Sequence, residues 1–252
     1  MWKYVDDVST SENLSKDSFS TTQSTLNSVQ VWATDNWFKL NVKKCKELRV
    51  RFLRESPQLL PLSIDSHALE TVHSHKVLGL TIQNNLKWDE HIFSTVSKAS
   101  KRLHILRVLR RGGVPAVELT IICVALIRSI LEYCCVVWHN AIPCHLSDDL
   151  ERIQKRAMRI IYPGQTYKEA LQLASCPRLD ARREDLCVKT LMSISKGGHL
   201  TQHMTQTRAC AHARITGHCI SVEQNVLRIV FFRIQYPRLT RNRQIMLIET
   251  HF

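Results

Sequence analysis

Apolar residues recur at steps of three and four between Trp88 and Ser195, the spacing of helices that bury one side. The first of these helices begins at Trp88 and ends at Gly112-Gly113, because paired glycines stop a helix. Its apolar positions are Ile92, Val96, Ala99, Leu103, Leu106 and Leu109. The pattern therefore predicts one buried face and one exposed face.

Two more long helices are predicted to follow the first. Pro115 opens the second at its first turn, and Ser147 caps the third through its hydroxyl. The buried positions predicted for the second are Leu119, Ile122, Leu126, Ile130 and Cys134, and for the third Leu150, Ile153, Ala157 and Ile160. Shorter helices are predicted over residues 167–174 and 182–195. Residues 86–197 are thus expected to form a helical bundle.

The first 85 residues have a different pattern, with β character after a single helix. The helix is predicted from Leu26, Val29, Trp32, Ala33 and Trp37. Leu48 and Val50 then alternate with Arg49 and Arg51, as in a half-buried strand. A further strand is predicted over Val77 to Ile82, where Gly79 suggests a bulge or a close backbone approach.

The end of the chain, residues 198–252, is poorly specified by its sequence. It contains a short apolar run among arginines, Val226 to Ile234. A zinc module is an alternative, because four residues here could bind zinc: Cys210, His212, His218 and Cys219. Their spacing, however, fits no standard zinc site. The fold class predicted for the whole chain is α+β, a small antiparallel sheet with a helix followed by a helical bundle.

The net charge and the cysteines indicate which partner and which cellular location to expect. The 252 residues carry a formal net charge of +13, which favours a polyanionic partner such as nucleic acid. Nine scattered cysteines without a secretory signal indicate reduced thiols, hence an intracellular location in cytoplasm or nucleus. No membrane span is expected, because Glu118, Arg128 and Glu132 interrupt the most apolar stretch.

A pair of adjacent carboxylates near the start supplies candidate chemistry. Tyr4-Val5-Asp6-Asp7 places two aspartates where a tight turn between two strands would let both carboxylates reach one ion. Carboxylate oxygens suit Mg²⁺, the ion that assists phosphoryl transfer. An ordinary acidic turn is the alternative.

Five blocks in a fixed order give this chain a resemblance to a known family. They are 2–7 (Trp-Lys-Tyr-Val-Asp-Asp), 40–48, 76–80, 86–92 and a helical segment that runs from Ile130 through Leu150 to Ala157. Together the sequence resembles the C-terminal part of the reverse transcriptase of non-LTR, LINE-type (jockey-like) retrotransposons, over about residues 1–195. The resemblance implies the end of a polymerase palm over residues 1–85 and a thumb-like bundle over 86–197.

The resemblance also implies roles for individual residues. Asp6 and Asp7 match the box that holds catalytic Mg²⁺, and Lys44 matches a lysine that protonates the departing pyrophosphate. The template–primer duplex, RNA or DNA, would be the partner, with no small-molecule cofactor beyond the dNTP of the parent enzyme. Lys44 could equally be a solvated lysine in a basic run.

This chain lacks parts that the family's polymerases need for DNA synthesis, so we predict that it is inactive. Fingers and a further catalytic aspartate would lie before Met1, and two-metal chemistry needs ligands beyond Asp6 and Asp7. We therefore expect no DNA synthesis by this chain alone. A basic helix face with Lys98, Lys101 and Arg102 is expected to bind nucleic-acid phosphates, although a solvated face would look the same.

Two rival classes stay open beside the polymerase reading. One is a helical module that binds nucleic acid without catalysis. The other follows from a resemblance of about residues 40–92 to the segment catalogued as the N-terminal domain of AlkB-type alkylation-repair homologues. An iron dioxygenase needs two histidines and a carboxylate, and none of the twelve histidines has an acid two positions later. We therefore expect no dioxygenase chemistry.

Overall fold

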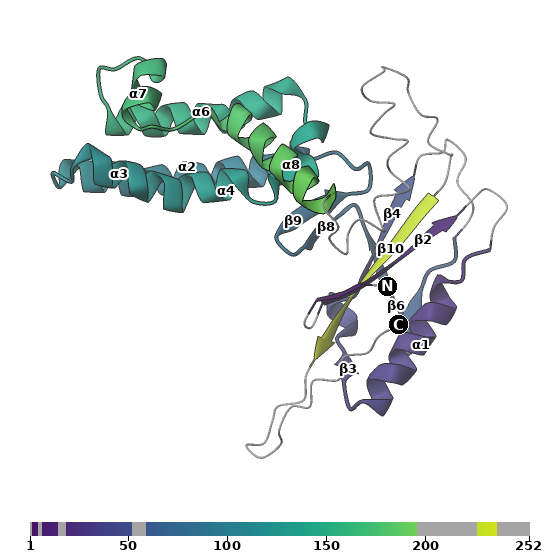
Figure 1. The fold of residues 1–252 in the computed structure, drawn as a ribbon. Coiled ribbons are helices and arrows are strands. Elements are labelled where there is room, and N and C mark those ends of the chain that lie inside the picture. Colours follow the sequence, from purple (N-terminus) through teal and green to yellow (C-terminus); the bar gives the residue numbers. More distant parts are fainter. Residues whose placement is uncertain (1, 5–6, 15–18, 52–58, 196–225, 236–252) are drawn as a thin grey trace, which may run out of the picture. The chain divides into compact units, whose positions relative to one another are not determined.

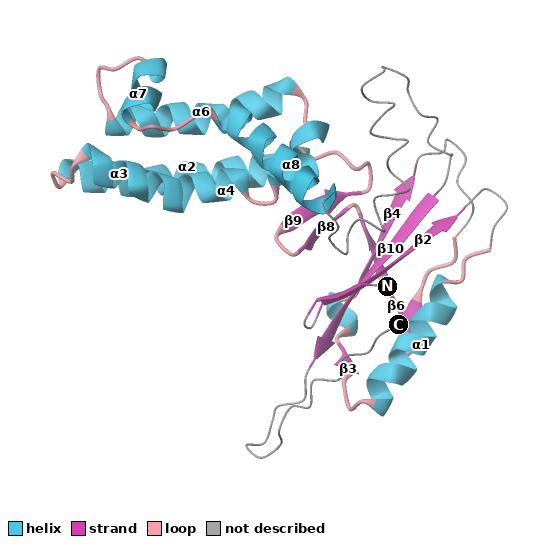
Figure 2. Ribbon diagram, in the orientation of Figure 1, coloured by secondary structure: helices cyan, strands magenta, loops and turns pink. Residues whose placement is uncertain are grey.

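The computed structural model describes residues 2–4, 7–14, 19–51, 59–195 and 226–235. The chain divides into two compact units. Unit 1 comprises residues 1–75, 83–85 and 222–252, and unit 2 comprises residues 76–82 and 86–221. Among the described residues, unit 1 consists mainly of strands with one α-helix, and helices dominate unit 2 (Figures 1 and 2). The predicted α+β class is therefore confirmed.

The sheet of unit 1 has the strand order β1-β2-β10-β4-β7, and β3 pairs with the end of β10. The strands are β1 (Trp2–Tyr4), β2 (Asp7–Leu14), β3 (Lys39–Leu40), β4 (Lys46–Arg51), β7 (Glu70–Val72) and β10 (Val226–Gln235). All neighbours are antiparallel except β4 and β7, which are parallel. Two short strands, β5 (Ser63–Ile64) and β6 (His67–Ala68), form a separate pair.

Helix α1 (Thr22–Asp35) belongs to the core of unit 1, and three of its predicted apolar positions, Leu26, Val29 and Ala33, are buried. Glu12 of β2 sets the start of this helix, because its carboxylate accepts hydrogen bonds from the Thr21 amide (2.7 Å) and the Thr22 hydroxyl (2.5 Å). Free amides at a helix N-terminus favour such an anion. Trp37, predicted as an inward position, lies beyond the helix and is 86% exposed.

The C-terminal tail contributes one regular element that its sequence did not specify. Val226–Gln235 forms β10, which lies between β2 and β4 in the sheet (Figure 1). The alternative zinc ligands, Cys210 to Cys219, lie outside the described residues. The treatment of residues 198–252 as unspecified is therefore corrected for these ten residues.

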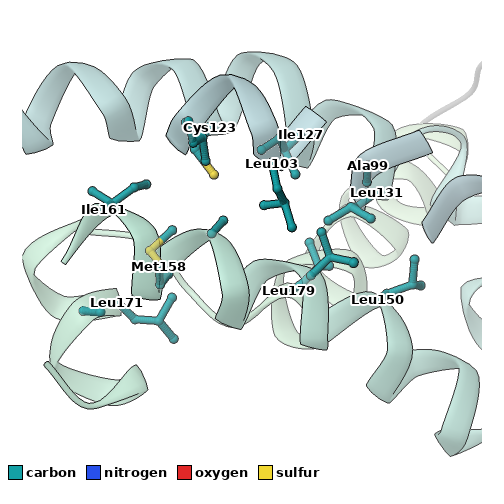
Figure 3. Packing of buried hydrophobic residues seen from close by; sticks show 14 of the residues in the cluster. Ala99, Leu103, Cys123, Ile127, Leu131, Leu150, Met158, Ile161, Leu171 and Leu179 are labelled. Carbon is teal, nitrogen blue, oxygen red and sulfur yellow. The ribbon is translucent and has the colours of Figure 1, made fainter. Parts of the chain in front are cut away.

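Unit 2 packs its helices around one core. They are α2 (Asp89–Arg111), α3 (Ala116–Cys123), the π-helical turn η2 (Val124–Arg128), α4 (Ser129–Glu132), α5 (Cys135–Trp138), the 3-10 turn η3 (His139–Ala141), α6 (Cys144–Ile161), α7 (Tyr167–Leu173) and α8 (Leu179–Ser195). Leu103 of α2, Ile127 of η2 and Met158 of α6 belong to one buried cluster, and Figure 3 shows such side chains converging from facing helices. The predicted stripe of α2 is confirmed, with Ile92, Ala99, Leu103 and Leu106 fully buried.

The buried line of the second helical segment lies one position beyond the predicted one. Leu119, Cys123, Ile127, Leu131 and Cys135 are buried, whereas Ile122, Leu126, Ile130 and Cys134 are half-buried. Steps of four drift around a regular α-helix, which has 3.6 residues per turn. The wider π turn η2 compensates for that drift, so residues spaced by four stay on one side.

The start of the third predicted helix and the last position of its buried line also differ from the prediction. Helix α6 begins at Cys144 after Pro143, so Ser147 lies inside the helix and does not cap it. Leu150, Ile153 and Ala157 are buried as predicted, and Ile161 rather than Ile160 completes the line.

The single strand predicted from Val77 to Ile82 is divided by a hairpin turn into the ends of two strands. Strands β8 (Ser74–Val77) and β9 (Leu80–Gln83) flank Leu78 and Gly79, which both have positive φ (47° and 90°). Positive φ at both central positions is the turn that fits twisted strands. The expected close approach at Gly79 is confirmed, since an added Cβ there would lie 3.0 Å from a ring carbon of Tyr133. The Tyr133 hydroxyl donates to the Leu78 carbonyl at 2.6 Å.

One helical run, Ala116–Ala141, is long and apolar enough to cross a membrane, with a mean hydropathy of 2.0 in its most apolar window. The sequence prediction counted its charges against a span, yet two of them, Arg128 and Glu132, are paired at 2.5 Å. A single such helix is weak evidence, because core helices pass the same test. Leu119, Ile127 and Leu131 of this run lie in the core of unit 2.

Candidate functional site

The acidic stretch near the start lies at a strand hairpin, as the sequence predicts. Trp2 pairs with Ser9, Lys3 with Val8 and Tyr4 with Asp7, so Tyr4 and Asp7 close a connection of two residues. Those two, Val5 and Asp6, lie outside the described residues. Tyr4 is exposed and Asp7 is half-buried at the end of β2. The hairpin geometry is therefore confirmed, while the metal role of Asp6 and Asp7 stays a prediction.

The strands on either side of Asp7 supply no second carboxylate. On one side its partner is Tyr4, and on the other the register of β10 places Arg233 opposite it. No residue of β10 is acidic. Within the described part of the chain, no group of three or more His, Cys, Asp and Glu residues could hold a metal ion. The Asp7 carboxylate suits Mg²⁺ as one ligand, and two-metal chemistry would need further carboxylates.

His75 lies close enough to Asp7 and to Lys46 to interact electrostatically with both. Burial lowers the pKa of His75, the Lys46 ammonium lowers it further, and the Asp7 carboxylate raises it. Lys46 in turn forms an ion pair with Glu70, its register partner on β7. His75 thus has one acidic and one basic neighbour, and burial, the largest cause of its lowered pKa, favours its neutral form.

Neither Lys46 nor His75 was predicted as a site residue, and Lys44 was predicted instead. Lys44 ends the 3-10 turn η1 (Val42–Lys44) and is exposed. The signal for Lys46 was its place at the start of the predicted strand, since that position carries it into the sheet next to β10.

The basic face of α2 is partly structural. Lys98, Lys101 and Arg102 are exposed, but the Arg102 guanidinium donates to the Leu126 carbonyl at 2.9 Å. Leu126 lies in the π turn, where changed spacing disturbs the regular backbone ladder. The Arg110 guanidinium likewise donates a hydrogen bond to a backbone carbonyl, that of Ile161 at the end of α6, at 2.7 Å. Lys98 and Lys101 are therefore the side chains of this predicted trio best placed for a polyanion.

A buried polar network ties α6 to α7 and α8, and the sequence reading missed it. The Glu151 carboxylate is 2% exposed and accepts hydrogen bonds from the Tyr167 hydroxyl, the Leu179 amide (3.1 Å) and the Asp180 amide (3.3 Å). Burial, and then the bond to this carboxylate, raise the pKa of Tyr167. The network holds the start of α8 in place, since a carboxylate there satisfies free amides.

Comparisons with protein-family models, with curated proteins and with solved structures find no match for this chain.

Proposed function

We propose that this chain is the C-terminal part of a reverse transcriptase of the non-LTR retrotransposon type, which binds nucleic acid but does not synthesise DNA. The observation that carries the proposal is the β1–β2 hairpin closed by Tyr4 and Asp7. A helix, a strand and then a helical unit follow it, in the order of palm and thumb. Unit 1 is then the remnant of the palm and unit 2 the thumb.

The expected absence of synthesis follows from the number of carboxylates that two-metal chemistry needs. Two metal ions a few Å apart need several carboxylates, and β10, the strand that pairs with β2, contains no acidic residue. A centre built on Asp6 and Asp7 alone would lack ligands for a second ion.

We expect no template-dependent primer extension by the purified chain with Mg²⁺ or Mn²⁺. The measurement is incorporation of labelled dNTP on an RNA or DNA template, with a complete reverse transcriptase as the positive control. Synthesis that disappears in Asp6→Ala would show that the hairpin is catalytic, and the inactivity part of the proposal would then be wrong.

Binding to nucleic acid is expected to be weak, independent of sequence and steeply dependent on salt. Replacing Lys98, Lys101 and Arg102 by alanine should flatten the slope of log K against log salt by up to roughly 2–3 units, about one per lost phosphate contact. Fluorescence anisotropy on duplexes of several sequences measures this. The Lys98→Ala/Lys101→Ala pair alone should account for most of the loss, because Arg102 also holds the Leu126 carbonyl.

A matched control removes two charges elsewhere in unit 2. Lys168 on α7 and Lys189 on α8 are exposed, so the Lys168→Ala/Lys189→Ala pair lowers the net charge equally. It should leave most of the affinity and slope intact. If the two double variants lose nucleic-acid affinity equally, the binding depends on the net charge of the protein and not on the basic face of α2.

A further inference from the structure

In the sheet of unit 1, β10 fills a space one strand wide between β2 and β4. Both strands are antiparallel to β10, so they run parallel to each other, and helix α1 connects them. They do not pair with one another, since β10 lies between them (Figure 1). The gap is thus built by residues 7–51, whereas the strand that fills it comes from the far end of the chain.

Main-chain pairing holds this strand on both sides. Its register with β2 runs from Val226 opposite Leu14 to Arg233 opposite Asp7. On the other side, its register with β4 runs from Val226 opposite Arg51 to Phe231 opposite Lys46. An unfilled gap would leave two facing strand edges with unpaired amides and carbonyls, which is a template for another strand.

We propose that the gap between β2 and β4 is a strand-acceptor site, and that its ligand is an extended, mostly apolar peptide with the sequence of Val226–Gln235. The acceptor strands contribute buried apolar residues, with Leu14 1% exposed and Leu48 and Val50 fully buried. Val226–Gln235 is rich in β-branched and aromatic residues, which favour a strand. Backbone hydrogen bonds supply the affinity in such strand addition.

In the intact chain the site is occupied by the chain's own strand. Because that strand belongs to the same chain, its effective concentration at the site is on the order of millimolar. A free peptide at micromolar concentration cannot compete with it. Cutting the chain between unit 2 and β10 after folding removes this advantage and exposes the site to exchange.

The test uses the full chain with a specific protease site inserted between Gly197 and Gly198, cleaved after purification. We expect the C-terminal piece to co-elute with the rest on gel filtration. A fluorescent peptide of Val226–Gln235 should then bind the cleaved protein at least about 100-fold more tightly than the uncut chain, and release the piece. The same peptide with proline in place of Ile229 should bind at least about tenfold more weakly, because proline cannot donate to the ladder.

A second variant needs no cleavage. Ile229 pairs with Ser11 on one side and Leu48 on the other, so Ile229→Pro in the full chain should displace β10 and let the labelled peptide bind. Helical circular dichroism reports whether unit 2 stays folded in this variant. Immediate separation of the cleaved pieces without peptide binding would overturn the proposal, as would equal binding to cut and uncut protein.

Discussion

Replacing Trp138 by alanine is expected to lower the free energy of unfolding of unit 2 by about 3–5 kcal/mol, the usual cost of truncating a large buried aromatic side chain. Trp138 is fully buried, and its indole N–H donates to the Tyr133 carbonyl at 3.0 Å. Its ring also lies 5.8 Å from the buried Arg183 guanidinium. The variant therefore loses packing, a hydrogen bond and a cation–π contact together. Urea unfolding followed by helical circular dichroism measures the loss.

Phe93 provides the matched control for Trp138 in the same unit. Its ring is 56% exposed, so Phe93→Ala should change the free energy of unfolding by no more than about 0.5 kcal/mol, as for most surface substitutions. Equal losses in the two variants would mean that Trp138 is not part of the core.

Replacing Glu151 by alanine is expected to cost about 2–4 kcal/mol of stability, because it leaves several buried donors without an acceptor. These donors are the Tyr167 hydroxyl and the amides of Leu179 and Asp180. The loss should concentrate at α7 and the start of α8. Hydrogen exchange of the Leu179 and Asp180 amides should speed up more than that of α2.

Glu151→Gln separates shape from charge in this network. The amide keeps one acceptor oxygen and the volume of the side chain, so it should retain part of the stability that alanine loses. Asp149 offers an exposed-pair comparison, since its ion pair with Arg152 lies at the surface of the same helix, and Asp149→Ala should cost at most about 1 kcal/mol. If Glu151→Ala costs no more than Asp149→Ala, the network contributes little.

Helices were the part of the fold most readable from the sequence, because their signals are local. The stripe of α2 needs only the positions of Ile92, Ala99 and Leu103 and the stop at Gly112. The buried positions of the following helical segment, from α3 through η2 to α4, could not be predicted in this way. Its π turn depends on packing against neighbours and on the Arg102 side chain that satisfies Leu126, and neither leaves a periodic trace.

The candidate site shows the same division between local and distant signals. Four adjacent residues were enough to predict the Tyr4–Asp7 hairpin, because the residues of the turn largely determine where a hairpin forms. The neighbours of Asp7 could not be predicted, since Arg233 and His75 reach it only through sheet pairing and chain folding across long separations. Strand β10 was missed for this reason, as its apolar run carries no information about its partners.

Strand β10 also determines the order in which the two units can complete their folding during synthesis. Leu14 meets its partner Val226 only after all of unit 2 has been made, so unit 2 can fold first while the central strand of unit 1 is still missing. Pairings of such long sequence separation form slowly, because a large loop must close before they contribute. Until then the edges of β2 and β4 are open to other chains. A ribosome that stops before Val226 would therefore release a protein with a folded helical unit and an unfinished sheet.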